Sequence, residues 1–147
     1  MSTLLGKTAL VTGSTSGIGL AIAQALASKG ASIVLNGFGD HEGARAEVTQ
    51  VVVATGSKAR VGYHGADMSR PNDIEAMMAY AAEEFGGVDI LVNNAGVQHV
   101  AKIEEFPVEK WDSILAINLT SAFHTTRLAL QHMRKNDWGR IVNVASV

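Results

Sequence analysis

The chain has 147 residues, long enough to bury most of its apolar surface, and one domain is predicted over residues 1–147. A formal net charge of −2 lacks the basic excess of nucleic-acid-binding proteins, and the absence of cysteine excludes disulfides, thiol catalysis and cysteine-ligated zinc. No apolar run approaches the ~20 residues of a membrane span, and the first predicted strand starts too close to Met1 for a signal peptide, so we expect a cytoplasmic protein.

Strand-like and helix-like segments alternate along the chain, which is typical of a parallel α/β sheet. The predicted strands are Thr8–Val11, Ser32–Asn36, Arg60–His64, Asp89–Asn93 and Arg140–Ala145. The predicted helices cover residues 18–29, residues 40–54, a third segment from its N-cap Ser69 to Gly86, and residues 108–135. Right-handed crossovers give the strand order 3-2-1-4-5, a Rossmann-type doubly wound sheet with its switch point between the first and fourth strands.

A glycine-rich turn, TGSTSGIG, follows the first strand. Gly13 allows a sharp turn, Gly17 lets the backbone approach a phosphate, and Gly19 lets the next helix pack closely on the strand. The N–H groups of the helix start then point toward an anion, as in loops that hold a nucleotide pyrophosphate, although the glycine spacing differs from GxGxxG. The candidate cofactor-binding residues here are Gly13, Thr15, Ser16, Gly17, Ile18 and Gly19.

Four further motifs follow in chain order: Asp67 after the third strand, NNAG at residues 93–96, Asn118 in INLTS and Ser146 in VNVAS. Together with the glycine turn, and in this order and spacing, they resemble the short-chain dehydrogenase/reductase family over the whole chain. The carboxyl ends of neighbouring parallel strands meet at one edge of a sheet, so we expect these motifs to converge on one site.

The family resemblance implies cofactor contacts after the third and fourth strands. Asp67 would accept a hydrogen bond from the adenine amino group, and the Met68 N–H would meet a ring nitrogen; a helix-capping role for Asp67 remains the alternative. Asn94, Ala95 and Gly96 would lie beside the nicotinamide ribose, whereas the preceding asparagine would brace the sheet.

The same resemblance implies catalytic roles for Ser146 and Asn118. Ser146 would hydrogen-bond the substrate oxygen, and Asn118 would interrupt its helix and feed a water chain; an ordinary strand-end serine and a tolerated helix asparagine are the alternatives. The family's Tyr-x-x-x-Lys motif would lie past Val147. We therefore expect a fold truncated after the fifth strand, in which the C-terminal part of the family fold is missing and the fragment alone is inactive.

The cofactor is expected to be NAD. NAD enzymes usually carry an acidic residue after the second strand, but Gly37 stands there, followed by Phe38 as a candidate cofactor contact. No arginine or lysine stands at this turn or within the glycine loop, so a 2′-phosphate would lack its usual cationic partner.

Residues 36–40, 96–99 and 103–107 resemble the D-3-hydroxybutyrate dehydrogenase branch of the family. The likeness implies interconversion of 3-hydroxybutyrate and acetoacetate, with Gln98 on the substrate carboxylate; an ordinary loop glutamine is equally compatible with the pattern. The alternatives are another short-chain reductase, acting on a sugar, a steroid or an acyl chain, and a non-catalytic nucleotide-binding fragment.

The five histidines show no metal-ligand spacing, so no metal is expected. Family resemblance implies a homotetramer for the complete protein. In the 147-residue chain, the helix at residues 108–135 and the strand at 140–145 would lose their cover and drive association. The apolar positions expected to be buried on that helix are Trp111, Ile114, Leu115, Phe123 and Leu130.

Overall fold

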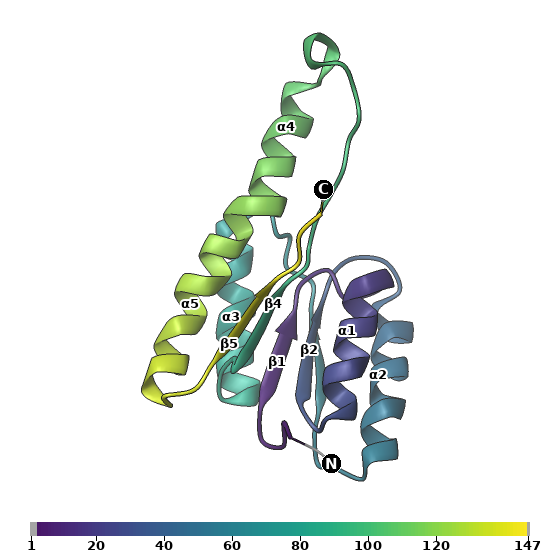
Figure 1. Ribbon diagram of the computed structural model, residues 1–147, viewed down its shortest axis with the longest axis vertical. Coiled ribbons are helices and arrows are strands. Elements are labelled where there is room, and N and C mark those ends of the chain that lie inside the picture. The colour runs from purple at the N-terminus through teal and green to yellow at the C-terminus, as the bar shows by residue number, and fades with distance from the viewer. Residues whose placement is uncertain (1–2, 147) are drawn as a thin grey trace.

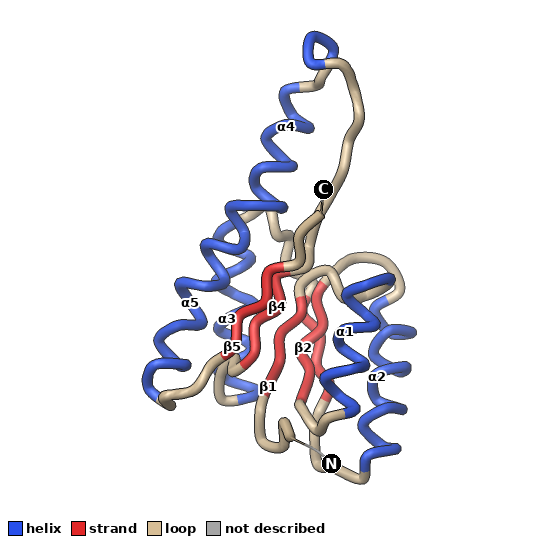
Figure 2. The backbone as a smooth tube through the Cα atoms, viewed as in Figure 1, coloured by secondary structure: helices blue, strands red, loops and turns tan. Residues whose placement is uncertain are grey.

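The computed structural model describes residues 3–146 and has one sheet of five parallel strands (Figures 1 and 2). The strand order, β3-β2-β1-β4-β5, confirms the predicted topology and its switch point between β1 and β4. The strands are β1 (Thr8–Val11), β2 (Ser32–Asn36), β3 (Val61–His64), β4 (Ile90–Asn93) and β5 (Arg140–Asn143).

Helices cover both faces of the sheet, as a doubly wound fold requires (Figure 1). Helices α1 and α2 pack together on one face, and α3 and α5 pack together on the other. The helices are α1 (Gly17–Ser28), α2 (His41–Thr55), α3 (Pro71–Phe85), α4 (Val108–Leu115) and α5 (Ser121–Lys135). None of the helices within residues 3–146 combines the length and the apolar character that crossing a membrane would need.

The core consists of two apolar clusters, one on each side of the sheet. Successive strand residues point to opposite faces, so Ala9 and Val11 pack in the cluster beneath α1 and α2, while Leu10 packs in the cluster beneath α3 and α5. All three side chains are fully buried, because β1 lies at the centre of the sheet with helices on both sides.

Several predicted boundaries shift in the structure. Strand β3 begins at Val61 and β5 ends at Asn143, one residue later and two residues earlier than predicted. The N-cap of α3 is Arg70 rather than Ser69, because the Ser69 hydroxyl donates to the Asp67 carboxylate instead of capping the helix.

The long helix predicted at residues 108–135 is divided by a π-helical turn, Ala116–Thr120. Helix α5 packs against α3 and β4, whereas α4 extends beyond the end of the sheet (Figure 1). Trp111, Leu115 and Phe123 are therefore exposed, at 52%, 41% and 63%, and the prediction that they are buried is wrong. Ile114 and Leu130 are half-buried.

Candidate functional site

A cleft lies at the carboxyl end of the sheet, where the loops after β1, β2, β3 and β4 meet. This is the position where open α/β sheets bind ligands, beside the switch point between β1 and β4. The lining residues are Gly13, Thr15, Ser16, Asn36, Gly37, Phe38, Ala66, Asp67, Met68, Asn94, Ala95, Gly96, Val97 and Ile117.

The glycine loop is packed too tightly for side chains at two of its glycines. Gly13 has φ +62°, and a Cβ there would lie 2.9 Å from the Cα of Ala95. A Cβ on Gly19 would collide with the carbonyl oxygen of Gly13 and with the Asn94 side chain. Helix α1 starts at Gly17, directly behind the N-cap Ser16, so its first N–H groups face the end of the cleft that the loop forms.

Thr12 and Asn94 bind the glycine loop to the loop after β4. The Thr12 Oγ1 accepts the backbone N–H groups of Asn94 and Ala95, at 3.0 and 2.9 Å. In return, the Asn94 Nδ2 donates to the carbonyl oxygens of Thr12 and Gly13, at 3.1 and 3.0 Å. The Asn94 amide is thereby held within the wall of the cleft.

Asn36, which sequence reasoning did not single out as a site residue, connects three loops. Its Oδ1 accepts the Gly13 N–H at 3.2 Å, and its Nδ2 donates to the carbonyl oxygens of His64 and Ala66 at 3.0 and 3.1 Å. The side chain is 1% exposed. A polar residue at the end of an otherwise apolar strand is the signal that could have found it, because buried amides need partners.

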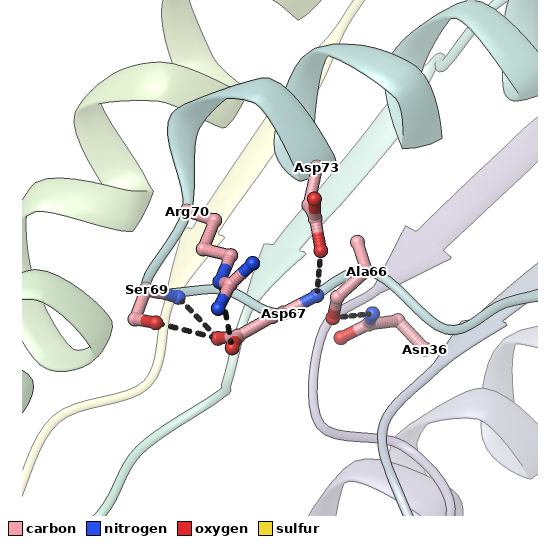
Figure 3. A network of polar contacts seen from close by, with 6 residues as sticks. All are labelled: Asn36, Ala66, Asp67, Ser69, Arg70 and Asp73. Carbon is pink, nitrogen blue, oxygen red and sulfur yellow. Dashed lines mark hydrogen bonds and ion pairs between the residues drawn. The ribbon is translucent and has the colours of Figure 1, made fainter.

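Asp67 presents a fixed carboxylate at the cleft (Figure 3). Its Oδ1 accepts from both the N–H and the Oγ of Ser69, at 2.9 and 2.6 Å, and Arg70 lies 3.6 Å from Oδ2. The hydrogen bonds from Ser69, with a smaller contribution from Arg70, hold the pKa of the Asp67 carboxyl below its usual range. The Asp67 N–H donates to the Asp73 carboxylate at 3.0 Å, and this bond attaches the loop after β3 to the first turn of α3.

The turn after β2 also lines the cleft, through Gly37 and Phe38. Phe38 is 68% exposed and lines the cleft, and its carbonyl accepts from the Thr15 hydroxyl at 2.5 Å. The residues lining this cleft include no lysine or arginine, and Asp67 is the charged residue among them. A cleft with this lining offers backbone and neutral side-chain contacts to a nucleotide.

Asn118 lies in the π-helical turn and binds the loop that carries Gln98. Its Oδ1 accepts the Val97 N–H at 2.8 Å, and its Nδ2 donates to the Val97 carbonyl at 2.9 Å. The two bonds attach the loop after β4 to the helix. Gln98 and Ser146 are both exposed and lie outside the residues that line the cleft.

Ser146 lies three residues past the end of β5. The Val144 N–H donates to the Asn93 carbonyl at 3.0 Å, so the C-terminal segment continues beside the loop that leaves β4 (Figure 1). By strand register Asn143 pairs with Asn93, so Ser146 is as far beyond β5 as Gly96 is beyond β4.

The structure therefore brings together nine of the predicted cofactor-binding residues and leaves three off the lining. Gly17 and Gly19 shape the loop behind it, and Ile18 is 68% exposed. The nine residues on the lining are Gly13, Thr15, Ser16, Phe38, Asp67, Met68, Asn94, Ala95 and Gly96. Within residues 3–146, no group of three histidine or acidic side chains is arranged to hold a metal ion.

The sequence of the chain matches known proteins along its length. The profile of the family described as short chain dehydrogenase matches residues 7–147. D-beta-hydroxybutyrate dehydrogenase of Cupriavidus necator is 68% identical over 97% of this chain and 54% of that protein. The protein of the same name from Rhizobium meliloti is 59% identical over 95% of this chain and 54% of that protein. The chain thus spans about half the length of these curated relatives.

Solved structures agree with the sequence matches. A metagenomic short-chain oxidoreductase in complex with NADP superposes with a TM-score of 0.89 at 34% identity, covering 99% of this chain and 65% of that one. A Serratia marcescens short-chain dehydrogenase/reductase mutant superposes with a TM-score of 0.86 at 33% identity, covering 98% of this chain and 57% of that one.

Proposed function

Since the chain belongs to the short chain dehydrogenase family, we propose that the protein interconverts 3-hydroxybutyrate and acetoacetate with NAD as the hydride carrier. The observation that carries the proposal is the sequence identity to two D-beta-hydroxybutyrate dehydrogenases, 68% and 59% over 97% and 95% of this chain. Residues 1–147 form the dinucleotide-binding domain in this proposal.

The cleft fits a dinucleotide by its own geometry. Gly13 and Gly19 let the loop pack closely against Ala95 and Asn94, a Cβ on Gly17 would meet nothing within 4 Å, and the start of α1 supplies N–H groups for a pyrophosphate. Asp67 remains ionised at neutral pH and is an acceptor for an adenine amino group. The absence of lysine and arginine from the lining supports NAD over a cofactor with a 2′-phosphate.

The cleft residues Gly13, Asp67 and Asn94 would hold NAD, which would supply the acceptor for the hydride of the substrate's alcohol carbon. In this proposal the Ser146 hydroxyl hydrogen-bonds the substrate oxygen and stabilises the charge that develops on it. Gln98 donates from its amide to the substrate carboxylate. Asn118 acts as a positioning residue, because its two bonds to Val97 hold the segment next to Gln98.

The first observation that tests the proposal is the reading frame past Val147, where a Tyr-x-x-x-Lys motif is expected. The activity is tested with a chimera in which residues 1–146 replace the matching half of the Cupriavidus necator relative, with the intact relative as the control. We expect NAD reduction with D-3-hydroxybutyrate and little with NADP, and a loss of about 10²–10³-fold in kcat on Ser146→Ala. Activity with a sugar acid or a steroid alcohol, and none with 3-hydroxybutyrate, would contradict the substrate assignment.

A homotetramer and a cytoplasmic location are also proposed for the complete protein, on the basis of the family. Sedimentation of the complete protein and fractionation of the cells that make it test the two proposals. A monomer, or recovery with the membranes, would contradict them.

A further inference from the structure

The turn between β2 and α2 is held from both sides by side-chain hydroxyls. From the glycine loop, Thr15 donates to the Phe38 carbonyl at 2.5 Å. From β3, the Tyr63 hydroxyl donates to the Gly37 carbonyl, also at 2.5 Å. Two successive carbonyl groups of one exposed turn are therefore fixed by side chains from two different elements.

This arrangement requires a glycine at position 37. Its φ is +142°, and a Cβ there would lie 2.8 Å from the Thr15 Oγ1. An acidic side chain at this position would displace Thr15, so the turn has no place for the carboxylate that usually selects NAD. Selection between NAD and NADP must then come from the shape of the turn and from the groups that hold it.

Both hydroxyl protons next to the turn are already committed to carbonyl groups. Thr15 and Tyr63 therefore have no proton left to donate to a phosphate, whereas the Thr15 oxygen still has lone pairs that can accept from a ribose hydroxyl. A ribose hydroxyl can therefore donate to the Thr15 oxygen, whereas a 2′-phosphate finds no donor in these two hydroxyls.

Tyr63 itself is well anchored. Its ring stacks on His41, in the first turn of α2, with 4.2 Å between centroids and 8° between planes. Strand β3 pairs with β2, which places Tyr63 opposite Leu35, two residues before Gly37. The Tyr63 hydroxyl is thus a fixed donor that reaches the turn from the sheet.

We infer that Tyr63 is a positioning residue for cofactor selection, whose hydroxyl holds the Gly37–Phe38 turn in the shape that accepts a ribose bearing two hydroxyls. The inference rests on the proposed function, because it requires that the cleft bind a nicotinamide dinucleotide. Phe38, exposed on the same turn and lining the cleft, is then held at a constant place beside the nucleotide.

The test compares Tyr63→Phe with Tyr80→Phe in the chimera that carries residues 1–146. The chain has two tyrosines, and among residues 3–146 no hydrogen-bond partner is found for the Tyr80 hydroxyl, so the control removes the same atom without removing a bond. Calorimetry gives the dissociation constants of NADH, NADPH, AMP and nicotinamide mononucleotide, and hydrogen exchange gives the protection of the amides at residues 37–39.

We expect Tyr63→Phe to raise the dissociation constants of NADH and AMP about 2- to 10-fold, the range for one lost hydrogen bond. The constants of NADPH and nicotinamide mononucleotide should change less, so the preference for NADH over NADPH falls, and the amides at 37–39 should exchange faster. Tyr80→Phe should leave all of these unchanged. If both variants bind NADH and NADPH as the unmodified chimera does, the inference is wrong; if the unmodified chimera binds neither NADH nor AMP, the proposed function fails first and the inference with it.

Discussion

We expect even a methyl group at Gly19 to disrupt the packing of the cleft wall. A methyl group there would collide with the Gly13 carbonyl and with the Asn94 amide, which are both part of the cleft wall. We expect Gly19→Ala to lower the free energy of unfolding by about 1–3 kcal/mol through overpacking, and to abolish NADH binding measured by calorimetry.

Gly56→Ala is the matched control for this glycine. Gly56 has φ +68° at the C-cap of α2, and its Cβ would meet nothing within 4 Å. The substitution should cost about 1–2 kcal/mol of backbone strain and leave NADH binding intact. Equal loss of binding in both variants would show that the effect of Gly19→Ala is general destabilisation.

Gly37→Asp should weaken NADH binding, although aspartate is the common residue at this position in NAD enzymes. The strained φ of +142° and the contact with Thr15 both oppose a side chain there. Gly39→Asp adds the same charge to the same loop at φ +86°, with no atom within 4 Å of its Cβ. Calorimetry should show the larger loss for Gly37→Asp, and tighter binding by that variant would refute the role given to the turn.

At the scale of one element, the end of β3 should make stability depend on pH. The His64 Nδ1 accepts the Ala66 N–H at 3.1 Å, which requires a neutral ring. Burial lowers the pKa of His64 from its ordinary 6.5, and the nearby Asp73 opposes this in part. As pH falls, the unfolded chain therefore takes up a proton at His64 before the folded chain does. The free energy of unfolding is highest above pH 6.5 and declines below it.

Thermal melts between about pH 7.5 and 5.5 measure this dependence. His64→Asn keeps an acceptor near the Nδ1 position and does not titrate. Its melting temperature should vary less over the same range than that of the unmodified chain. Equal pH dependence of the melting temperature in the two proteins would show that a group other than His64 causes it.

At the scale of the whole molecule, we expect the 147-residue chain to associate through α5 and β5. Leu119 and Phe123 are 66% and 63% exposed and line a groove beside Asn143 of β5. Within residues 3–146, β5 pairs with β4 alone, so its other edge is open to a further strand. An apolar groove next to an open sheet edge favours self-association.

Sedimentation of a double variant, Leu119→Lys with Phe123→Lys, tests this surface. The double variant should associate less than the unmodified chain. Val53→Lys adds a charge at a residue that is 72% exposed on α2, at the other side of the sheet, and should change nothing. A monomeric unmodified chain with a cooperative melt would show that the expectation is wrong.

The 147 residues alone should turn over no 3-hydroxybutyrate. Ser146 can polarise a substrate oxygen but cannot exchange its proton, and both tyrosines lie on β3 and α3, where Tyr63 already bonds to Gly37. NADH formation by the pure polypeptide, measured by absorbance, should be at background. Measurable NADH formation by the pure polypeptide that survives Ser146→Ala would refute this expectation.

Part of the site could be predicted from the residue types that follow the strands. Gly13, Asp67 and Asn94 each follow a buried strand, and the topology of a parallel sheet brings such positions together. Asn36 and Tyr63 were not readable in this way. Their roles depend on partners 23 to 30 residues away. The polarity of Asn36 at the end of an apolar strand indicates that it needs partners but not which ones, and nothing in the local sequence distinguishes Tyr63 from an ordinary strand residue.

The sequence by itself determined the order of the strands, the two helical layers and the place of the cleft, because hydrophobic periodicity assigns the elements, and right-handed crossovers together with the order of the motifs favour this doubly wound arrangement. Only the tertiary structure decided which apolar residues are covered. Helix periodicity identifies an apolar stripe on residues 108–135, but α4 extends beyond the end of the sheet, so Trp111 and Leu115 stay exposed although the Trp111 ring meets that of Phe106. Burial depends on the neighbours that an element meets, and those are set by the fold as a whole.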